Sequence, residues 1–206
     1  MNKSSTKPKG ATSYKQTSFG IIPRTKFLQL EIEGTIKGIE FVATCYHQKL
    51  TPQLILKVHK IAFAWIFPDW AGKYRTIRVQ YSDKEAPLPH LIPALTTNLC
   101  ADLEERLKHL DRSNIDDVIE LLAWFQHRFV WIHPFQDYNG RLARMLTTFL
   151  LLQLGLPPIE IQADSKQDRE NYLQAMYSAD DGNYKKLESL IKQALDESLC
   201  NAIGSK

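Results

Sequence analysis

The sequence predicts an all-α domain that carries one small β-hairpin. Two observations lead to this fold class. Apolar residues recur at spacings of three and four through most of the chain after about residue 27, which is the period of an amphipathic helix. One short segment instead alternates apolar and polar residues, which is the period of a strand. With 206 residues, 44% of them hydrophobic and 24% charged, the chain has the composition of an ordinary globular protein and the length for one well-cored domain.

Helical periodicity marks six stretches in the part of the chain after residue 50. They cover residues 52–67, 92–110, 114–132, 140–154, 168–177 and 184–199. The first begins at Thr51-Pro52, an N-cap followed by proline at the first helical position. The third must stop before Pro134, which cannot continue a helix. The fourth is the most apolar, so we expect it to be the central buried helix.

The strand pattern covers Thr76 to Tyr81, where β-branched or aromatic residues alternate with polar ones. Turn-forming residues follow at positions 82–84, and several prolines follow these. This arrangement predicts one strand or a short hairpin. A two-stranded hairpin is only marginally stable by itself, so we expect this one to offer an edge with which another segment pairs.

The first 26 residues form a basic segment. They contain six lysines and arginines and no acid, and the whole chain has a net charge of +3, so the remainder carries −3. Because the segment is also rich in Ser and Thr, we expect residues 1–26 to be a disordered tail and residues 27–206 to form the folded domain. A nucleic-acid-binding arm is an alternative to a solvated leader. The folded body has no basic excess, which argues against a nucleic-acid-binding domain.

Several classes of protein are excluded by what the sequence lacks. No stretch reaches the roughly 20 apolar residues of a membrane helix. No apolar run follows the N-terminal lysines, as a secretory signal requires. Cys45, Cys100 and Cys200 are odd in number and widely spaced, which argues against a disulfide framework or a zinc site and fits a reducing compartment. We therefore expect a cytoplasmic protein that does not enter a membrane.

The residues with chemical potential concentrate between Trp131 and Arg144, in a loop that joins two apolar helices. His133 stands at the end of the first helix. Asn139 and Gly140 can adopt the left-handed backbone angles that turn consecutive amides toward an anion. The next helix begins there, and the unpaired N–H groups of its first turn add to such a site.

Arg141 and Arg144 carry the wrong charge for the start of a structural helix, because the macrodipole disfavours a cation there by about 0.3–1 kcal/mol. A phosphate reverses this cost, and the guanidinium fork matches its oxygens. Asp137 would repel a phosphate unless a divalent cation, Mg²⁺ by default, bridges the two. A neutral His133 can accept the proton of an attacking hydroxyl, so the set predicts phosphoryl or nucleotidyl transfer.

Each of these residues also has a plainer explanation. A histidine at a helix end is more often structural, and Asn-Gly is often only a turn. A calcium-binding loop is excluded because Arg141 occupies a position that needs an oxygen ligand. An arginine-led helix could enter a DNA groove, but no helix-turn-helix partner accompanies it. The dense and ordered set favours the phosphate site.

The run from His133 to Arg144, His-Pro-Phe-x-Asp-x-Asn-Gly-Arg-x-x-Arg, resembles the signature of the Fic (fido) proteins, His-Pro-Phe-x-(Asp/Glu)-Gly-Asn-(Gly/Lys)-Arg-x-x-Arg. The resemblance extends from about residue 28 to residue 199. Trp70–Arg75 is similar to the entry to the family's flap, and Leu156–Ile159 to the connection after its central helix. The resemblance implies a Fic-type bundle of about seven helices with a β-hairpin flap. It also implies a protein adenylyltransferase, which uses Mg²⁺ and transfers AMP from ATP to a Tyr, Thr or Ser hydroxyl of a target protein.

The resemblance further implies roles for individual residues. His133 would deprotonate the target hydroxyl, Asp137 would bind Mg²⁺, and Phe135 would anchor the loop in the core. The nucleotide would be held by Gln136, Asp137, Tyr138, Asn139, Gly140, Arg141, Arg144 and, beside the adenine, Tyr172. The flap would include Tyr81, Ser82, Asp83 and Lys84, and a target segment would dock there by strand addition.

One position departs from the family pattern, because Tyr138 stands where the family usually has glycine. If the backbone there has a positive φ, tyrosine is strained by about 1–2 kcal/mol. Either the loop differs, or the Tyr138 amide does not point at the β-phosphate. A catalytically silent module that binds a nucleotide or a partner is therefore an alternative function.

Family members often carry an inhibitory helix whose glutamate pairs with the second arginine of the signature and fills the γ-phosphate site. Gln29–Gly34 resembles its pattern, (Ser/Thr)-x-x-x-Glu-(Gly/Asn), which makes Glu33 the expected inhibitory residue and Arg144 its partner. Glu31 and Glu40 fit less well, because neither precedes Gly or Asn. Alternatively, Glu33 ends a short helix before a glycine, or orients a water that removes AMP from a modified protein. A homodimer is also compatible with the sequence.

Overall fold

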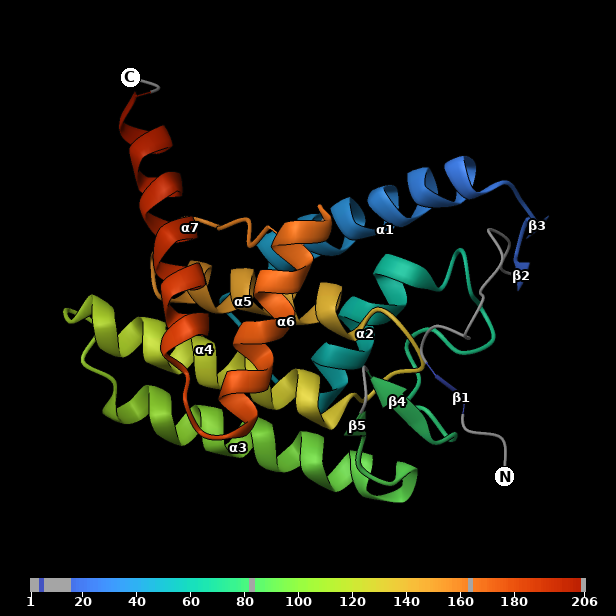
Figure 1. Cartoon of the computed structure of the whole chain (residues 1–206), viewed down its shortest axis with the longest axis horizontal. Helices are drawn as coiled ribbons and strands as arrows, with labels where there is room; N and C mark the ends of the chain where they lie inside the picture. The colour runs from blue at the N-terminus through green and yellow to red at the C-terminus, as the bar shows by residue number, and fades with distance from the viewer. Residues whose placement is uncertain (1–3, 6–15, 82–83, 163–164, 205–206) are drawn as a thin grey trace.

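The computed structural model describes residues 4–5, 16–81, 84–162 and 165–204 of the chain. Within these ranges it contains seven α-helices (Figure 1): α1 (Arg24–Cys45), α2 (Pro52–Phe63), α3 (Ile92–His109), α4 (Ile115–Ile132), α5 (Asn139–Gln153), α6 (Lys166–Asp180) and α7 (Lys185–Gly204). The 3-10 turn η1 (Pro89–Leu91) precedes α3. The predicted all-α fold class is confirmed. Among the described residues, no helix has the length and apolar character to cross a membrane.

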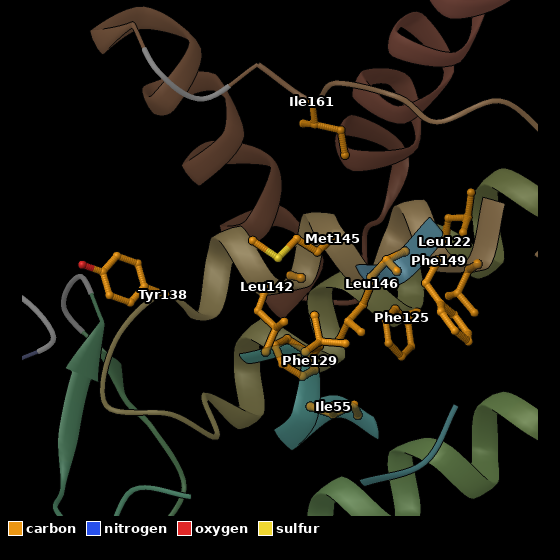
Figure 2. Packing of buried hydrophobic residues seen from close by; sticks show 14 of the residues in the cluster. Ile55, Leu122, Phe125, Phe129, Tyr138, Leu142, Met145, Leu146, Phe149 and Ile161 are labelled. Carbon is orange, nitrogen blue, oxygen red and sulfur yellow. The ribbon is translucent and has the colours of Figure 1, made fainter. Parts of the chain in front are cut away.

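Helix α5 lies at the centre of the fold, as its apolar sequence predicted. It packs against α1, α2 and α4, and most of its residues are buried. Figure 2 shows Leu146 and Phe149 of α5 close to Phe125 of α4, all three fully buried. Helices α3 and α7 also pack on α4, and α6 packs on α7. The loop between α4 and α5 is therefore held at both ends by core helices.

Helix α1 runs on through Gly34, where the sequence suggested that a helix could end. The reason is close packing. A Cβ atom at Gly34 would lie 2.4 Å from the backbone oxygen of Ala62 in α2, and one at Gly38 would lie 2.6 Å from the sulfur of Met145 in α5. The two glycines let α1 approach both helices and place Glu31 on its buried face.

The predicted strand belongs to a short antiparallel hairpin, β4 (Val79–Tyr81) and β5 (Lys84–Glu85), which we call the flap. The strand begins at Val79, three residues later than predicted. Strand β1 (Ser4–Ser5) pairs in parallel with the other edge of β4 (Figure 1). The flap therefore offers an edge that another segment joins, as its isolation in the sequence led us to expect. Ser82 and Asp83 lie outside the described residues.

The folded part of the chain begins before residue 27. Strands β2 (Gln16–Thr17) and β3 (Gly20–Ile21) form a second small hairpin. Between them, Ser18 donates its hydroxyl to the carbonyl of Trp65 at 2.6 Å. The predicted boundary at residue 26 is therefore wrong for residues 16–26, which are part of the fold. Residues 1–3 and 6–15 of the predicted tail lie outside the described residues.

Candidate active site

His133 ends helix α4 in a left-handed backbone conformation, with φ 50° and ψ 57°. Its N–H donates to the carbonyl of Phe129, and Pro134 then turns the chain away from the helix axis. The ring nitrogen Nδ1 lies 3.1 Å from the carbonyl oxygen of Val130. Since a carbonyl can only accept, Nδ1 carries the hydrogen, and the lone pair of the neutral ring is on Nε2.

The His133 ring is buried, and burial lowers its pKa from 6.5 to about 4; the nearby Arg75 charge adds to this effect. The imidazole is therefore neutral at pH 7. A neutral ring with its lone pair on Nε2 is the form that a general base needs. The geometry supports the chemistry that the sequence assigned to this residue.

His59 of α2 contacts the loop and supports it, a role that was not predicted from the sequence. The N–H of Gly72 donates to its Nδ1 at 2.8 Å, so the ring hydrogen is on Nε2, which donates to the carbonyl of Asp137 at 3.2 Å. The ring also stacks on Phe135, with 3.8 Å between centroids and 4° between planes. Phe135 is fully buried, as expected of a core anchor. The sequence signal was a histidine beside the apolar stripe of a predicted helix.

Two of the buried histidines, His59 and His133, predict a specific dependence of stability on pH. Burial lowers the pKa of both His59 and His133 to about 4, below the 6.5 of an unfolded chain. Protons therefore bind the unfolded state preferentially, so stability is full above about pH 6.5 and falls as the pH drops toward 4. In a His59→Gln variant, the free energy of unfolding should depend less steeply on pH. The expected decrease in slope is that of one proton, about 1.4 kcal/mol per pH unit. Urea unfolding between pH 7 and pH 4.5 measures it. The exposed His109→Gln is the control, and an unaltered slope in His59→Gln would contradict the assignment.

Asn139 braces the loop across four residues. Its Oδ1 accepts from the N–H of Phe135 and its Nδ2 donates to the Phe135 carbonyl, both at 2.9 Å. The side chain is buried and engaged with the loop backbone through both its oxygen and its nitrogen, so the structure gives it a bracing role, and its predicted contact with phosphates stays a prediction. Asn139 and Gly140 also form the first helical turn of α5 and are not left-handed. The left-handed non-glycine residues among those described are His133 and Tyr138.

Tyr138 adopts φ 64° and ψ 14°, the positive φ that its glycine counterpart would take without strain. Its N–H donates to Oδ1 of Asp137 at 2.8 Å, so this amide is already engaged by a carboxylate. The ring is buried and stacks on Phe63 at 4.1 Å. The hydroxyl, which Figure 2 shows directed away from Leu142, donates to Oε1 of Glu31 at 2.6 Å. Stacking and this hydrogen bond offset the backbone strain.

Restoring the family glycine at position 138 should therefore destabilise the protein. Removing a buried aromatic ring costs about 3–5 kcal/mol, whereas relief of the left-handed backbone returns about 1–2 kcal/mol. We expect Tyr138→Gly to lose roughly 2–3 kcal/mol and to melt about 4–10 °C lower in a thermal scan. The melting temperature of Tyr138→Phe, which keeps the ring and loses only the hydroxyl, should fall less. A Tyr138→Gly variant that melts at or above the wild-type temperature would contradict this account.

The two arginines of the first turn of α5 have different partners. Arg141 Nη2 lies 3.2 Å from Oε2 of Glu31, and its Nη1 is buried without a hydrogen-bond partner among the described residues. The guanidinium of Arg144 lies 5.9 Å from the ring centre of Tyr172. No carboxylate of the described part of the chain forms an ion pair with Arg144. One arginine at this helix start is therefore neutralised by a glutamate and the other is not.

Glu33 does not make the predicted contact with Arg144. Its side chain is half-exposed and forms an ion pair with Lys37 of the same helix at 2.7 Å. Residues two apart on a helix point about 200° apart, so the rotation of α1 that buries Glu31 turns Glu33 outward. The glutamate that reaches the loop is Glu31, which the motif comparison had ranked lower.

The flap contacts the helices next to Tyr172. Lys84 of β5 pairs with Asp180 of α6 at 2.5 Å, and Asp180 also pairs with His127 of α4 at 2.9 Å. Tyr172 accepts a hydrogen bond from Gln126 at 3.0 Å and lines a small cavity beside these residues. Of the remaining predicted site residues, Gln136 is half-buried in the loop, and Tyr81 pairs with Lys84 through the backbone.

The residues present fit Mg²⁺ only as an ion that arrives with a nucleotide. Among the described residues, no group of three or more His, Cys, Asp or Glu side chains could hold a metal ion. Asp137 supplies one carboxylate next to the start of α5. Because Mg²⁺ commonly binds through one or two carboxylates and the phosphates of its substrate, this donor set suits a nucleotide-borne ion and not a resident one.

Comparisons with known proteins give matches in sequence and in fold. The family model described as "Fic/DOC family" matches residues 49–151. A curated relative, "Protein adenylyltransferase Fic" of Nematostella vectensis, is 29% identical over 164 residues, which cover 75% of this chain and 35% of the relative. This chain therefore spans about a third of the length of that relative.

Solved structures share the fold. A Fic domain containing signaling protein from Bacteroides thetaiotaomicron has a TM-score of 0.72 and 24% identity, covering 84% of this chain and 70% of that one. The N-terminal Fic domain of a Bartonella quintana protein, solved with bound ADP, has a TM-score of 0.70 and 18% identity, covering 90% of this chain and 92% of that one.

Proposed function

The chain belongs to the Fic/DOC family, and on that premise we propose that it is a nucleotidyltransferase that moves AMP from ATP to a Tyr, Thr or Ser hydroxyl of a target protein. The observation that carries the proposal is the His133–Arg144 loop. It combines a buried neutral histidine with two arginines at a helix start, where the helix dipole disfavours cations and an anion stabilises them. Relatives named protein adenylyltransferase and a related domain with bound ADP add support.

In the proposed reaction, Nε2 of His133 accepts the proton of the target hydroxyl as its oxygen attacks the α-phosphorus of ATP. A new O–P bond forms, the bond between the α-phosphorus and the bridging oxygen breaks, and pyrophosphate leaves. Arg141, Arg144 and the N–H groups at the start of α5 stabilise the leaving phosphates. Mg²⁺ held by Asp137 and the nucleotide would neutralise phosphate charge.

The proposal is tested by comparing two labelled forms of ATP in the presence of Mg²⁺. Label in the α-phosphate should become covalently attached to protein, while label in the γ-phosphate should not, because pyrophosphate carries it away. The other nucleoside triphosphates, used in competition, identify the base of the donor. Incorporation of γ-label would indicate phosphoryl transfer instead, and no incorporation of either label under any condition would favour the silent binding module.

We further propose that Glu31 restrains this activity. Its carboxylate neutralises Arg141 at 3.2 Å and accepts from Tyr138 at 2.6 Å, so it occupies a guanidinium that a phosphate of ATP requires. A carboxylate and a phosphate compete for the same fork. Glu31 thus takes the inhibitory role that the motif gave to Glu33. Its partner is Arg141, the first arginine of the signature, and not Arg144. The outward position of Glu33 gives no support to its use in removing AMP.

A further inference from the structure

Arg75 is a charged side chain buried in the interior, with only 4% of its surface exposed. Burial lowers its pKa to about 10, so it remains charged at neutral pH. Burying such a charge is costly unless hydrogen bonds replace the lost water. In this structure backbone carbonyls replace the lost water. The positions of these carbonyls indicate the role of Arg75.

Each arm of the Arg75 guanidinium reaches a different segment. Nε donates to the carbonyl of His133 at 2.6 Å, Nη1 to that of Ile77 at 2.9 Å, and Nη2 to that of Pro87 at 2.7 Å. Ile77 and Pro87 each stand two residues outside the flap strands, at the two roots of the flap. The backbone N–H of Arg75 adds a bond to the carbonyl of Pro134 at 3.0 Å.

The contact with His133 falls on a strained residue. A left-handed histidine costs on the order of 1–3 kcal/mol and persists only where the surroundings fix it. The N–H of His133 is fixed by Phe129, and its carbonyl is fixed by Arg75. The guanidinium of Arg75 therefore fixes the backbone of His133 and, at the same time, the two ends of the flap.

We propose that Arg75 is a positioning residue that fixes the flap relative to His133, so that a hydroxyl on a strand docked at β4 meets Nε2 of the histidine. The inference rests on the proposed transferase function. Pairing of β1 with the outer edge of β4 supports it, because this edge accepts a strand, and a docked target strand would take the place of β1 there. A displacement of about 1 Å between a reactant and its catalytic group can cost on the order of 100-fold in rate.

The geometry also explains why arginine stands here. Three close carbonyls, with that of Ile132 as a fourth at 3.5 Å from Nη2, match the fixed fork of a guanidinium, whereas an ammonium is a single centre on a flexible stem. Lysine at position 75 could reach one of the three carbonyls but could not hold all of them at once. Arg75→Lys should therefore recover only part of what Arg75→Met loses.

The test uses the full chain and three readouts. Arg75→Met and Arg75→Lys are made in a Glu31→Ala background, so that the proposed restraint does not hide activity, with Arg78→Met as a matched control at an exposed arginine of the same segment. Incorporation of α-labelled ATP into the chain itself measures transfer. Calorimetry with ATP and Mg²⁺ measures affinity and binding stoichiometry. Hydrogen exchange measures the flap amides of β4 and β5.

We expect Arg75→Met to reduce incorporation about 10- to 100-fold while ATP affinity stays within about twofold and stoichiometry is unchanged. Exchange at β4 and β5 should become faster, with Arg75→Lys intermediate and Arg78→Met like the parent. Incorporation by Arg75→Met at the level of the Glu31→Ala parent would overturn the proposal. A binding stoichiometry that falls in step with incorporation would also overturn it, because it would show a purely structural role. If the Glu31→Ala parent incorporates no label, the transferase function fails. Unchanged flap exchange in Arg75→Met would separately overturn the proposed anchoring.

Discussion

Replacing His133 by alanine should lower incorporation of α-labelled AMP by about 100- to 10,000-fold, the usual contribution of a general base. The ring is neutral and carries its lone pair on Nε2, because Nδ1 donates to Val130. Alanine removes the acceptor for the hydroxyl proton. It leaves Arg141 and Arg144 in place, so binding of ATP should persist. The measurement is incorporation at saturating ATP, with calorimetric ATP affinity recorded on the same protein.

His133→Asn is the matched control for this experiment. Its side-chain amide can still donate to the Val130 carbonyl, but it offers no basic nitrogen. We expect it to fold better than the alanine variant and to be equally inactive. If either variant kept more than about a tenth of the parent rate, the base would have to be another group, since the lower limit for loss of a general base is about 100-fold.

The sequence predicted the helices and the loop between α4 and α5 because their signals are local. Apolar spacing marks a helix face, Pro134 stops α4, and arginines at a helix start indicate an anion. The supporting residues His59 and Arg75 have no such local signal. Apart from Ile77, their hydrogen-bond partners are 12 to 78 residues away along the chain, and these partners are backbone groups that any residue carries. Only the tertiary structure brings these groups together.

The choice between Glu31 and Glu33 shows where a motif and a helix face disagree. The motif selects Glu33 because a glycine follows it. The buried positions of α1 are Phe27, Glu31, Gly34, Gly38, Val42 and Cys45, a run of three- and four-residue steps that includes Glu31 and excludes Glu33. This periodicity was present in the sequence, but it is interrupted by two glycines. Their role as close-packing positions against α2 and α5 becomes clear only from the structure.

Tyr138 illustrates a different limit of sequence reasoning. The positive φ and its strain were foreseeable from the family glycine, but the compensation was not. It comes from Phe63 on α2 and Glu31 on α1, which are distant in sequence. The same contacts tie the loop to α1, so the residue that replaces glycine also connects the site to the helix that carries the restraint.

Glu31→Ala should therefore activate the protein and destabilise it at once. Loss of the charged contact frees Arg141 for phosphate, and a hydrogen bond to a charged group is worth about 1.5–3 kcal/mol, or roughly 10- to 100-fold in ATP affinity and incorporation at limiting ATP. The buried hydroxyl of Tyr138 loses its acceptor, which costs about 1–3 kcal/mol of stability. Incorporation of α-labelled AMP and a thermal scan measure the two effects.

Glu33→Ala is the matched control, because it removes the same side chain two residues away on the same helix. Glu33 is half-exposed, and in the described part of the chain its ion pair is with Lys37, an interaction worth about 0.3–0.5 kcal/mol, so neither activity nor stability should change measurably. Activation by Glu33→Ala and not by Glu31→Ala would mean that α1 turns in solution to bring Glu33 to the arginines. Gly34 and Gly38 argue against that rotation, since any residue turned into their places would clash with Ala62 and Met145. The pair of variants thus tests both the identity of the restraining glutamate and the packing that selects it.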